Sequence, residues 1–320
     1  MSLRQKFQLL LASTRLANHP SVVCNVWLGV AMGVSFCPPM LPYWPAAFQL
    51  AVSGILLYLS GNFLNDWHDR HWDAQHRPER ALPQGAFAPG LYLGLGAFCA
   101  LSGVALAGFI GVASGGVAAV IVLCVVIYTR WHKQAAWSVL VMGLCRALLP
   151  LLFFIEWPLG GIRSGRYSGG IFPALVFISV AVLALMLYVA ALSWIARSET
   201  KPSPPAASGV DGRFLLAVSG LSMAVFGLCW HPLLGLLGLL PFACWLGLCL
   251  TRYRQPVPRH IAALLAGLPL LDWVLLLPLS VWMLRTMGEV RHLPLALTCL
   301  LLPPLAFVSG RLLQRVAAAT

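Results

Sequence analysis

Charged side chains are scarce in this chain. Only 9% of its 320 residues are Asp, Glu, Lys or Arg, whereas 60% are hydrophobic and the mean hydropathy is +0.85. A soluble globular domain carries roughly 25% charged residues, so the composition excludes that class. The apolar runs are long and unbroken rather than alternating, which excludes a transmembrane β-barrel. We therefore expect an all-α fold, a polytopic transmembrane helical bundle that forms a single domain over residues 1–320.

Acidic residues and paired cysteines are few as well. The nine Asp and Glu are outnumbered by 21 Lys and Arg, and the net charge is +12. We interpret this excess as orientation in a membrane and contact with lipid head groups, with no nucleic-acid partner. The nine cysteines include no CxxC pair, so neither a zinc site nor a disulfide framework is predicted. Arg4 and Lys6 precede an apolar run without a convincing cleavage site, so a retained helix is expected there.

Long apolar runs dominate what remains. A helix that spans a bilayer needs about 20 mostly apolar residues. The sequence predicts ten spans, of which the first and the fourth are short, and only Trp230–Pro232 separates the seventh from the eighth. The ten predicted spans are 21–37, 44–63, 90–110, 114–129, 136–156, 171–196, 213–230, 233–251, 260–284 and 293–311.

The loop charges predict the orientation. With a cytoplasmic start, the inside segments hold 16 Lys and Arg and the outside loops hold 4. Because cytoplasmic loops are enriched in Lys and Arg, we expect both termini inside, in a bacterial inner (cytoplasmic) membrane. The loops that follow the second, fourth and sixth spans then share one side of the membrane, where they can converge on one site.

Residues 62–85 form the one long polar island in the first half of the chain and hold three of its five aspartates. In a helix, steps of three and four residues place four of the polar side chains on one face: Asn62, Asp66, Asp69 and Asp73. Stacked carboxylates repel one another unless cations sit on them. Mg²⁺ typically uses one or two carboxylates plus phosphate oxygens, and Arg77 and Arg80 can hold the remaining phosphate charge. The alternative is a solvated loop between two membrane helices.

Two charges are predicted within the membrane. Arg146 lies in an apolar run, where a charge is costly, so we expect it to face a partner or a wet cavity. A carboxylate of the aspartate island or a bound diphosphate would serve. Asp272, also within an apolar run, is a functional candidate by the same argument, and it is an alternative partner for Arg146.

The aspartate island resembles the first aspartate-rich motif of the UbiA-type intramembrane prenyltransferases, which include 4-hydroxybenzoate polyprenyltransferase-like enzymes. That motif reads NDxxDxxxD and is followed by an Arg-Pro segment and a glycine; here these are Asn65, Asp66, Asp69 and Asp73, then Arg77-Pro78, Arg80 and Gly85. The end of the fourth span, Tyr128 to Lys133, resembles the tyrosine and basic residues that the family carries there.

The resemblance implies transfer of a prenyl group from a prenyl diphosphate to a hydrophobic acceptor, aromatic or lipid-like, within the membrane. Mg²⁺ is the implied cofactor. The implied catalytic residues are Asp66, Asp69, Asp73 and Lys133, and the implied metal ligands are Asp66, Asp69, Asp73 and Glu199. The implied substrate-binding residues are Asn62, Asn65, Arg77, Arg80, Tyr128, Arg130, Arg146, Tyr188, Arg197 and Glu199. For Arg130 and Lys133, the alternative is an ordinary positive anchor at the membrane surface.

The chain departs from the family pattern at 188–199, where a second aspartate-rich motif normally stands. This stretch has no aspartate, and Glu199 is its only carboxylate, with Arg197 nearby. The Arg-Ser-Glu pattern is similar to the EboC-like branch of the family. The family usually has nine helices, one fewer than we predict here.

Two other functions fit the sequence. A non-catalytic membrane protein that binds or moves an isoprenoid or a pigment would explain the missing second motif. A cation transporter would use acids spread through the membrane, such as Asp66 and Asp272, whereas most acids here are gathered in one segment.

Overall fold

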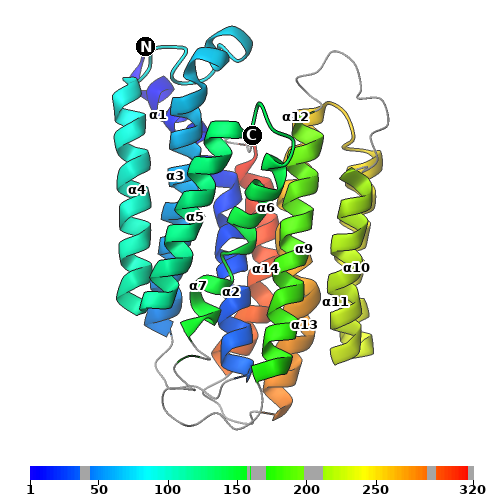
Figure 1. Cartoon of the computed structure of the whole chain (residues 1–320). Helices are drawn as coiled ribbons and strands as arrows, with labels where there is room; N and C mark the ends of the chain where they lie inside the picture. The colour runs from blue at the N-terminus through cyan, green and yellow to red at the C-terminus, as the bar shows by residue number, and fades with distance from the viewer. Residues whose placement is uncertain (37–43, 157–158, 160–170, 198–211, 287–292, 316–320) are drawn as a thin grey trace.

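The structure is a computed structural model, and it describes the chain except for residues 37–43, 157–158, 160–170, 198–211, 287–292 and 316–320. Long helices run up and down along one common axis (Figure 1). The described helices are α1 Leu3–Thr14, the 3-10 turn η1 Leu16–Asn18, α2 His19–Phe36, α3 Trp44–His76, α4 Pro89–Ile110, α5 Val112–Trp131, α6 Ser138–Ala147, α7 Leu151–Phe154, α9 Ile171–Arg197, α10 Gly212–Trp230, α11 Pro232–Thr251, α12 Val257–Ala266, α13 Leu268–Thr286 and α14 Leu293–Leu313. This arrangement confirms the all-α polytopic bundle.

The core of the bundle is built around α2 and α13. Helix α2 packs against α3, α7, α13 and α14, and α13 packs against α11 and α14 as well. Both helices carry apolar residues around their whole circumference, with a few buried polar ones, as expected of helices enclosed by others; Leu28 and Leu276, for example, are fully buried. By contrast, α4 and α11 stand at opposite edges and expose many large apolar side chains, among them Phe98 and Leu240. Such an apolar exterior suits a lipid environment.

Eight helices in the described part of the chain are long and apolar enough to cross a membrane. They include α10 and α11 as separate helices, which confirms the predicted division. Pro232 begins α11, and the His231 ring accepts a hydrogen bond from the backbone N–H of Leu234 at 3.4 Å. Proline is favoured at the first helical position because its missing N–H would have no partner there.

The two remaining predicted spans differ from the prediction. The first, 21–37, is helix α2, which begins earlier, at His19, and α1 precedes it without having been predicted. The fifth, 136–156, is not one helix: α6 ends at Ala147 and α7 begins at Leu151. Pro150 lies in the break, and a Cβ on Gly29 of α2 would stand only 1.8 Å from the carbonyl oxygen of Pro150. Gly29 therefore lets α2 approach the break between α6 and α7, because a side chain at this position would collide with the backbone of Pro150.

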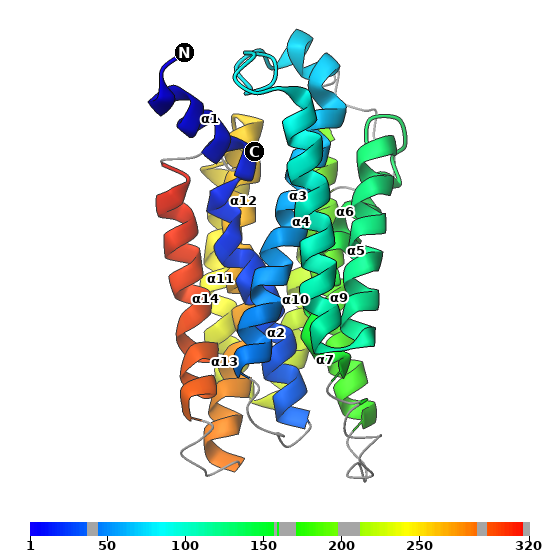
Figure 2. The same ribbon diagram turned by 90° about the vertical axis from the view of Figure 1, so that its left-hand side faces the viewer.

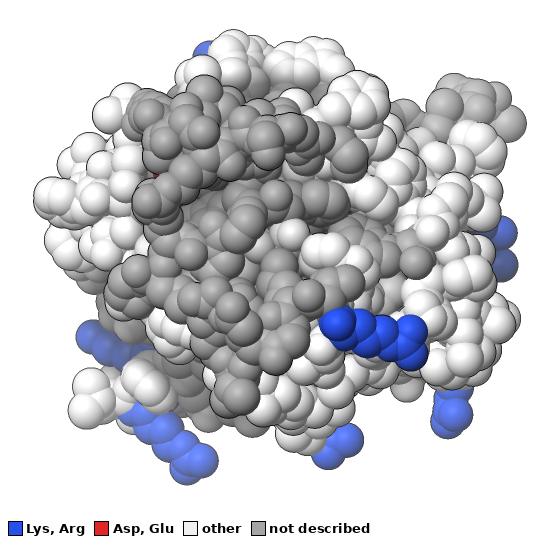
Figure 3. Space-filling view, turned by 90° about the horizontal axis from the view of Figure 1, so that it is seen from below, with Lys and Arg blue, Asp and Glu red and all other residues white. Residues whose placement is uncertain are grey.

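The two ends of the bundle carry different elements. Helix α1, the end of α14 and the 77–88 turn lie at the upper end (Figures 1 and 2). Seen from below, the described surface of the other end is mostly uncharged, with scattered Lys and Arg and scarcely any acidic atoms (Figure 3). The aspartates of α3 lie at the end that holds α1, because Arg15 at the end of α1 contacts Asp66.

Candidate functional site

Helix α3 continues unbroken from the membrane span into the polar island and ends only at His76. The predicted helical face is therefore present, and all four of its polar side chains are buried: Asn62, Asp66, Asp69 and Asp73. The alternative of a solvated loop is wrong. Because buried carboxylates on neighbouring turns repel one another, each needs a compensating group nearby.

Arg80 compensates two of the carboxylates. One guanidinium nitrogen donates to Asp73 at 2.9 Å and to Asp66 at 3.3 Å. The turn that carries Arg80 is anchored by a small apolar cluster, in which Ala81 and Ala86 pack against Tyr92. The position of Arg80 over the aspartates is thus fixed by packing as well as by charge.

Arg15, at the end of α1, approaches the same face from another side. It donates to the side-chain oxygen of Asn62 at 2.8 Å and reaches Asp66 at 3.5 Å. The Asn62 amide in turn donates to the carbonyl oxygen of Thr14 at 3.0 Å. Burial lowers the pKa of the Arg15 guanidinium, but the carboxylate of Asp66 and other nearby groups outweigh it and raise the pKa above its ordinary value. Arg15 therefore stays cationic beside Asp66.

Asp69 is met by the segment that follows α5. Lys133 Nζ lies 2.7 Å from one carboxylate oxygen, and His132 Nε2 lies 3.1 Å from the other. Lys133 also stands 4.2 Å from the centre of the Trp72 ring, a cation–π contact that helps to orient it. Residues more than 60 positions apart in the sequence are thus brought together at Asp69.

Arg197, the last residue of α9, binds the backbone of this segment. Its guanidinium donates to the backbone carbonyl of His132 and, at 3.1 Å, to that of Ala135. It touches the peptide backbone that carries Lys133, so it can hold His132 and Lys133 against Asp69. The three polar segments that were expected to share one side therefore converge here.

Among the residues that the structure describes, no three His, Cys, Asp or Glu side chains lie close enough together to hold a metal ion by themselves. Two oxygens in the cluster, Asn65 Oδ1 and Asp73 Oδ1, are nevertheless buried without a hydrogen-bond partner. Such hard oxygens are the ligands that Mg²⁺ prefers, and Mg²⁺ usually takes one or two carboxylates plus substrate oxygens. Asp73 Oδ1 is therefore an open carboxylate oxygen, and a magnesium ion held here would take most of its other ligands from a substrate phosphate and water.

The other predicted site residues lie at varying positions. Tyr128 stacks on His132 with ring centres 5.0 Å apart, below the cluster. Arg130 is exposed on α5, and Arg77 lies in the turn that leads to Arg80. Tyr188 donates to the carbonyl oxygen of Leu264 at 2.9 Å, so the structure places its hydroxyl against α12 rather than at the aspartates. Glu199 lies outside the described residues.

Arg146 belongs to a second polar group, deeper in the bundle. It donates to the side chains of Ser21 and Asn25 on α2. Asn25 then donates to Asp272 on α13 at 2.7 Å. The structure thus connects Arg146 to Asp272 through Asn25 and does not pair it with a carboxylate of the island.

Three side chains that contact the aspartates are absent from the predicted site: Arg15, His68 and His132. In the sequence, Arg15 is one of the 16 basic residues predicted to lie inside, and the two histidines lie within the polar segments beside the motif residues. A sequence signal existed for His132, because it lies four residues after Tyr128, on the same helical face. Arg15 carried no such signal, since its contacts with Asn62 and Asp66 cross 47 and 51 residues.

These features define a polytopic helical membrane protein with a buried acidic and basic site at one end of its bundle. The family model described as the UbiA prenyltransferase family matches residues 26–271, well over half of the chain, and the chain therefore belongs to that family. The match does not distinguish branches, so the EboC-like assignment stays a prediction. No curated protein matches the chain.

One solved structure, described in terms of digeranylgeranylglyceryl phosphate synthase in membranes, aligns over 93% of this chain and 98% of that one. The two chains are 12% identical and superpose with a TM-score of 0.44.

Proposed function

We propose that this protein transfers a prenyl group from a prenyl diphosphate to a hydrophobic acceptor inside the membrane, with Mg²⁺ as cofactor. The observation that supports the proposal best is the meeting of α3 with cations from three other segments: Arg15, Arg80 and Lys133. A diphosphate is a compact anion, and arginine forks and lysine ammonium groups are its usual protein partners. Carboxylates beside them are what a bridging magnesium needs.

The aspartates and the cations would serve different parts of the substrate. Asp66, Asp69 and Asp73 would hold Mg²⁺, with Glu199 as a further ligand, and the bound metal offsets the negative charge of the departing diphosphate. Arg80 and Lys133 now use their donors on the carboxylates. We propose that these donors turn to the phosphate oxygens when substrate and metal arrive together, and that they stabilise the leaving group.

The placement of the site suits two hydrophobic substrates. The cluster lies at one end of α3, and the rest of that helix continues into an apolar bundle. A prenyl chain could therefore extend away from its diphosphate among apolar side chains that exclude water. The excess of Lys and Arg in the predicted inside loops favours placing the aspartate end on the cytoplasmic side.

The second candidate is a non-catalytic protein that binds or moves an isoprenoid or a pigment. It is favoured by the missing aspartates at 188–199 and by the fact that each carboxylate of α3 already has a basic partner. Such a protein would bind isoprenoids without releasing diphosphate.

The deciding experiment measures diphosphate release by the purified protein in nanodiscs, with labelled prenyl diphosphates of several chain lengths. We expect release that depends on Mg²⁺ and falls at least a hundredfold in Asp66→Asn and Asp69→Asn, because each loses a charged ligand of the leaving-group site. Glu79→Gln is the matched control, since it removes an exposed acid from the same end of the molecule. Unchanged release in both aspartate variants would refute the proposed site, and isoprenoid binding without any release would favour the second candidate.

A further inference from the structure

Helix α1 exposes large apolar side chains although it lies at the polar end of the molecule. Leu3 is 85% exposed and Phe7 is 59% exposed. Figure 2 shows α1 projecting sideways from the upper end of the bundle, at an angle to the long helices. An exposed apolar face at this level has to be covered by something other than the bundle itself.

The charges of α1 flank this face. At about 100° per residue, Leu3 and Phe7 are about 40° apart around the helix axis. Lys6 then lies about 60° to one side of Leu3, and Arg4 lies about 60° to the other side of Phe7. Both basic residues are exposed. An apolar face with basic residues along both of its edges is the pattern of a helix that lies in a membrane interface.

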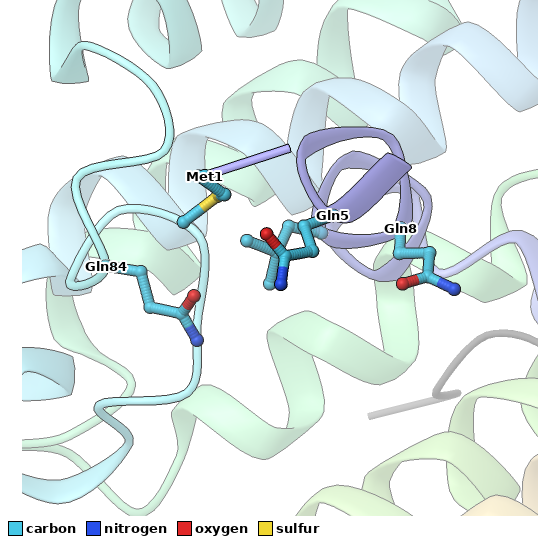
Figure 4. Close-up of a pocket in the computed structure, with 5 residues that line it drawn as sticks. Met1, Gln5, Gln8 and Gln84 are labelled. Carbon is cyan, nitrogen blue, oxygen red and sulfur yellow. The ribbon is translucent and has the colours of Figure 1, made fainter. Parts of the chain in front are cut away.

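The remaining faces of α1 are already assigned. Gln5 and Gln8 point to the opposite side, where they line a cavity of about 500 Å³ with Met1, Leu9 and Gln84 (Figure 4). A third face packs against the bundle, with Ser13 and Tyr92 hydrogen-bonded at 2.7 Å. Along its first two turns, helix α1 therefore has one polar side and one apolar, basic-edged side that no described part of the chain covers. Further along, the helix packs on the bundle through Leu9 and Leu10.

Helix α1 ends at the aspartate cluster. Arg15 is its C-cap and adopts a left-handed conformation, with φ of 49°, that non-glycine residues rarely take. From this position it bonds Asn62 and reaches Asp66. Because α1 and Arg15 are continuous, the placement of the helix governs the placement of the guanidinium.

We propose that α1 docks on an anionic lipid surface, with Leu3 and Phe7 inserted among the acyl chains and Arg4 and Lys6 against the lipid phosphates, and that this docking holds Arg15 on the aspartate cluster. The occupant is a membrane because the exposed face joins apolar and basic groups on a protein that already spans a bilayer. Each basic residue near an anionic surface contributes about 1 kcal/mol, so the pair shifts the docking equilibrium by roughly 30-fold.

The experiment uses hydrogen exchange of the full chain in nanodiscs of phosphatidylcholine, with and without phosphatidylglycerol. We expect the amides of residues 3–14 to be more protected when phosphatidylglycerol is present. Arg4→Gln with Lys6→Gln should abolish this difference, and Leu3→Ser with Phe7→Ser should lower protection in both lipids. The matched control is Arg252→Gln with Arg254→Gln, which removes two exposed charges outside α1 and should preserve the lipid-dependent protection.

Equal protection in the two lipids, or an equal loss in the Arg252/Arg254 control, would overturn the docking. The proposed link between docking and Arg15 is tested by hydrogen exchange of the 62–69 amides. We expect this exchange to be faster in the Arg4/Lys6 variant, because Arg15 leaves Asn62. Unchanged exchange there would refute the link to the cluster. Both readouts are independent of prenyl transfer. If docking holds and no diphosphate is released, the proposed function fails alone.

Discussion

Each aspartate of α3 depends on a particular basic side chain. Asp73 and Asp66 share Arg80, Asp66 also has Arg15, and Asp69 has Lys133. All three carboxylates are at most 10% exposed, so solvent gives them little compensation. Breaking a buried pair leaves an uncompensated charge, which costs more than the pair itself contributes.

Replacing Arg80 by Gln tests this dependence. We expect the metal-free protein to lose about 2 kcal/mol of stability, because two carboxylates lose a charged donor. Added Mg²⁺ should then raise the melting temperature of Arg80→Gln more than that of the wild type, since the metal supplies the missing positive charge. Thermal unfolding in nanodiscs, with and without Mg²⁺, measures both effects. Arg130→Gln, which removes an exposed charge from α5, is the control; equal Mg²⁺ responses in all three proteins would contradict the proposed metal site.

The second polar group, Arg146 with Asn25 and Asp272, can be tested by replacing its two charged residues. Arg146 and Asp272 are connected through Asn25, and all three side chains are buried in the bundle. Each single replacement, Arg146→Gln or Asp272→Asn, leaves the other charge buried without its counterpart, and the double replacement removes both. We expect the double variant to be more stable than the sum of the single losses predicts, by about 1–3 kcal/mol. A double-mutant cycle from unfolding measurements checks this, and strict additivity would show that the two charges do not interact.

Among the elements, prediction succeeded where the pattern was local. The polar face of α3 followed from the spacing of its residues, and the division of α10 from α11 followed from Pro232. The break after Ala147 was missed because hydropathy alone does not register a proline inside an apolar run. Helix α1 was missed because a short amphipathic helix carries little of the signal that identifies a membrane span. The contacts of Arg15 and His132 were beyond local reasoning, since they depend on how distant helices pack.

The close contact between α2 and the α6–α7 break can be tested at Gly29. A Cβ at Gly29 would meet the backbone of Pro150, which cannot move aside as the end of a flexible side chain could. We expect Gly29→Ala to cost at least 1–3 kcal/mol through overpacking and to lower the melting temperature. Gly94→Ala on α4 is the matched control, because nothing lies within 4 Å of its added Cβ and alanine favours helix. Equal melting temperatures for the two variants would show that α2 and the break can separate freely.

At the scale of the whole molecule, the fold gathers at one end the elements that the loop charges predict to be inside. Helix α1 and the end of α14 lie at one end of the bundle, together with the aspartate cluster, and the α10–α11 connection lies at the other (Figures 1 and 2). The predicted inside loops hold 16 Lys and Arg against 4 outside, so the aspartate end should face the cytoplasm. We expect green fluorescent protein to fluoresce when fused to either end of the chain, and alkaline phosphatase to be active when fused after Trp230. An active phosphatase at the end of α14 would place the site on the other side of the membrane and contradict this orientation.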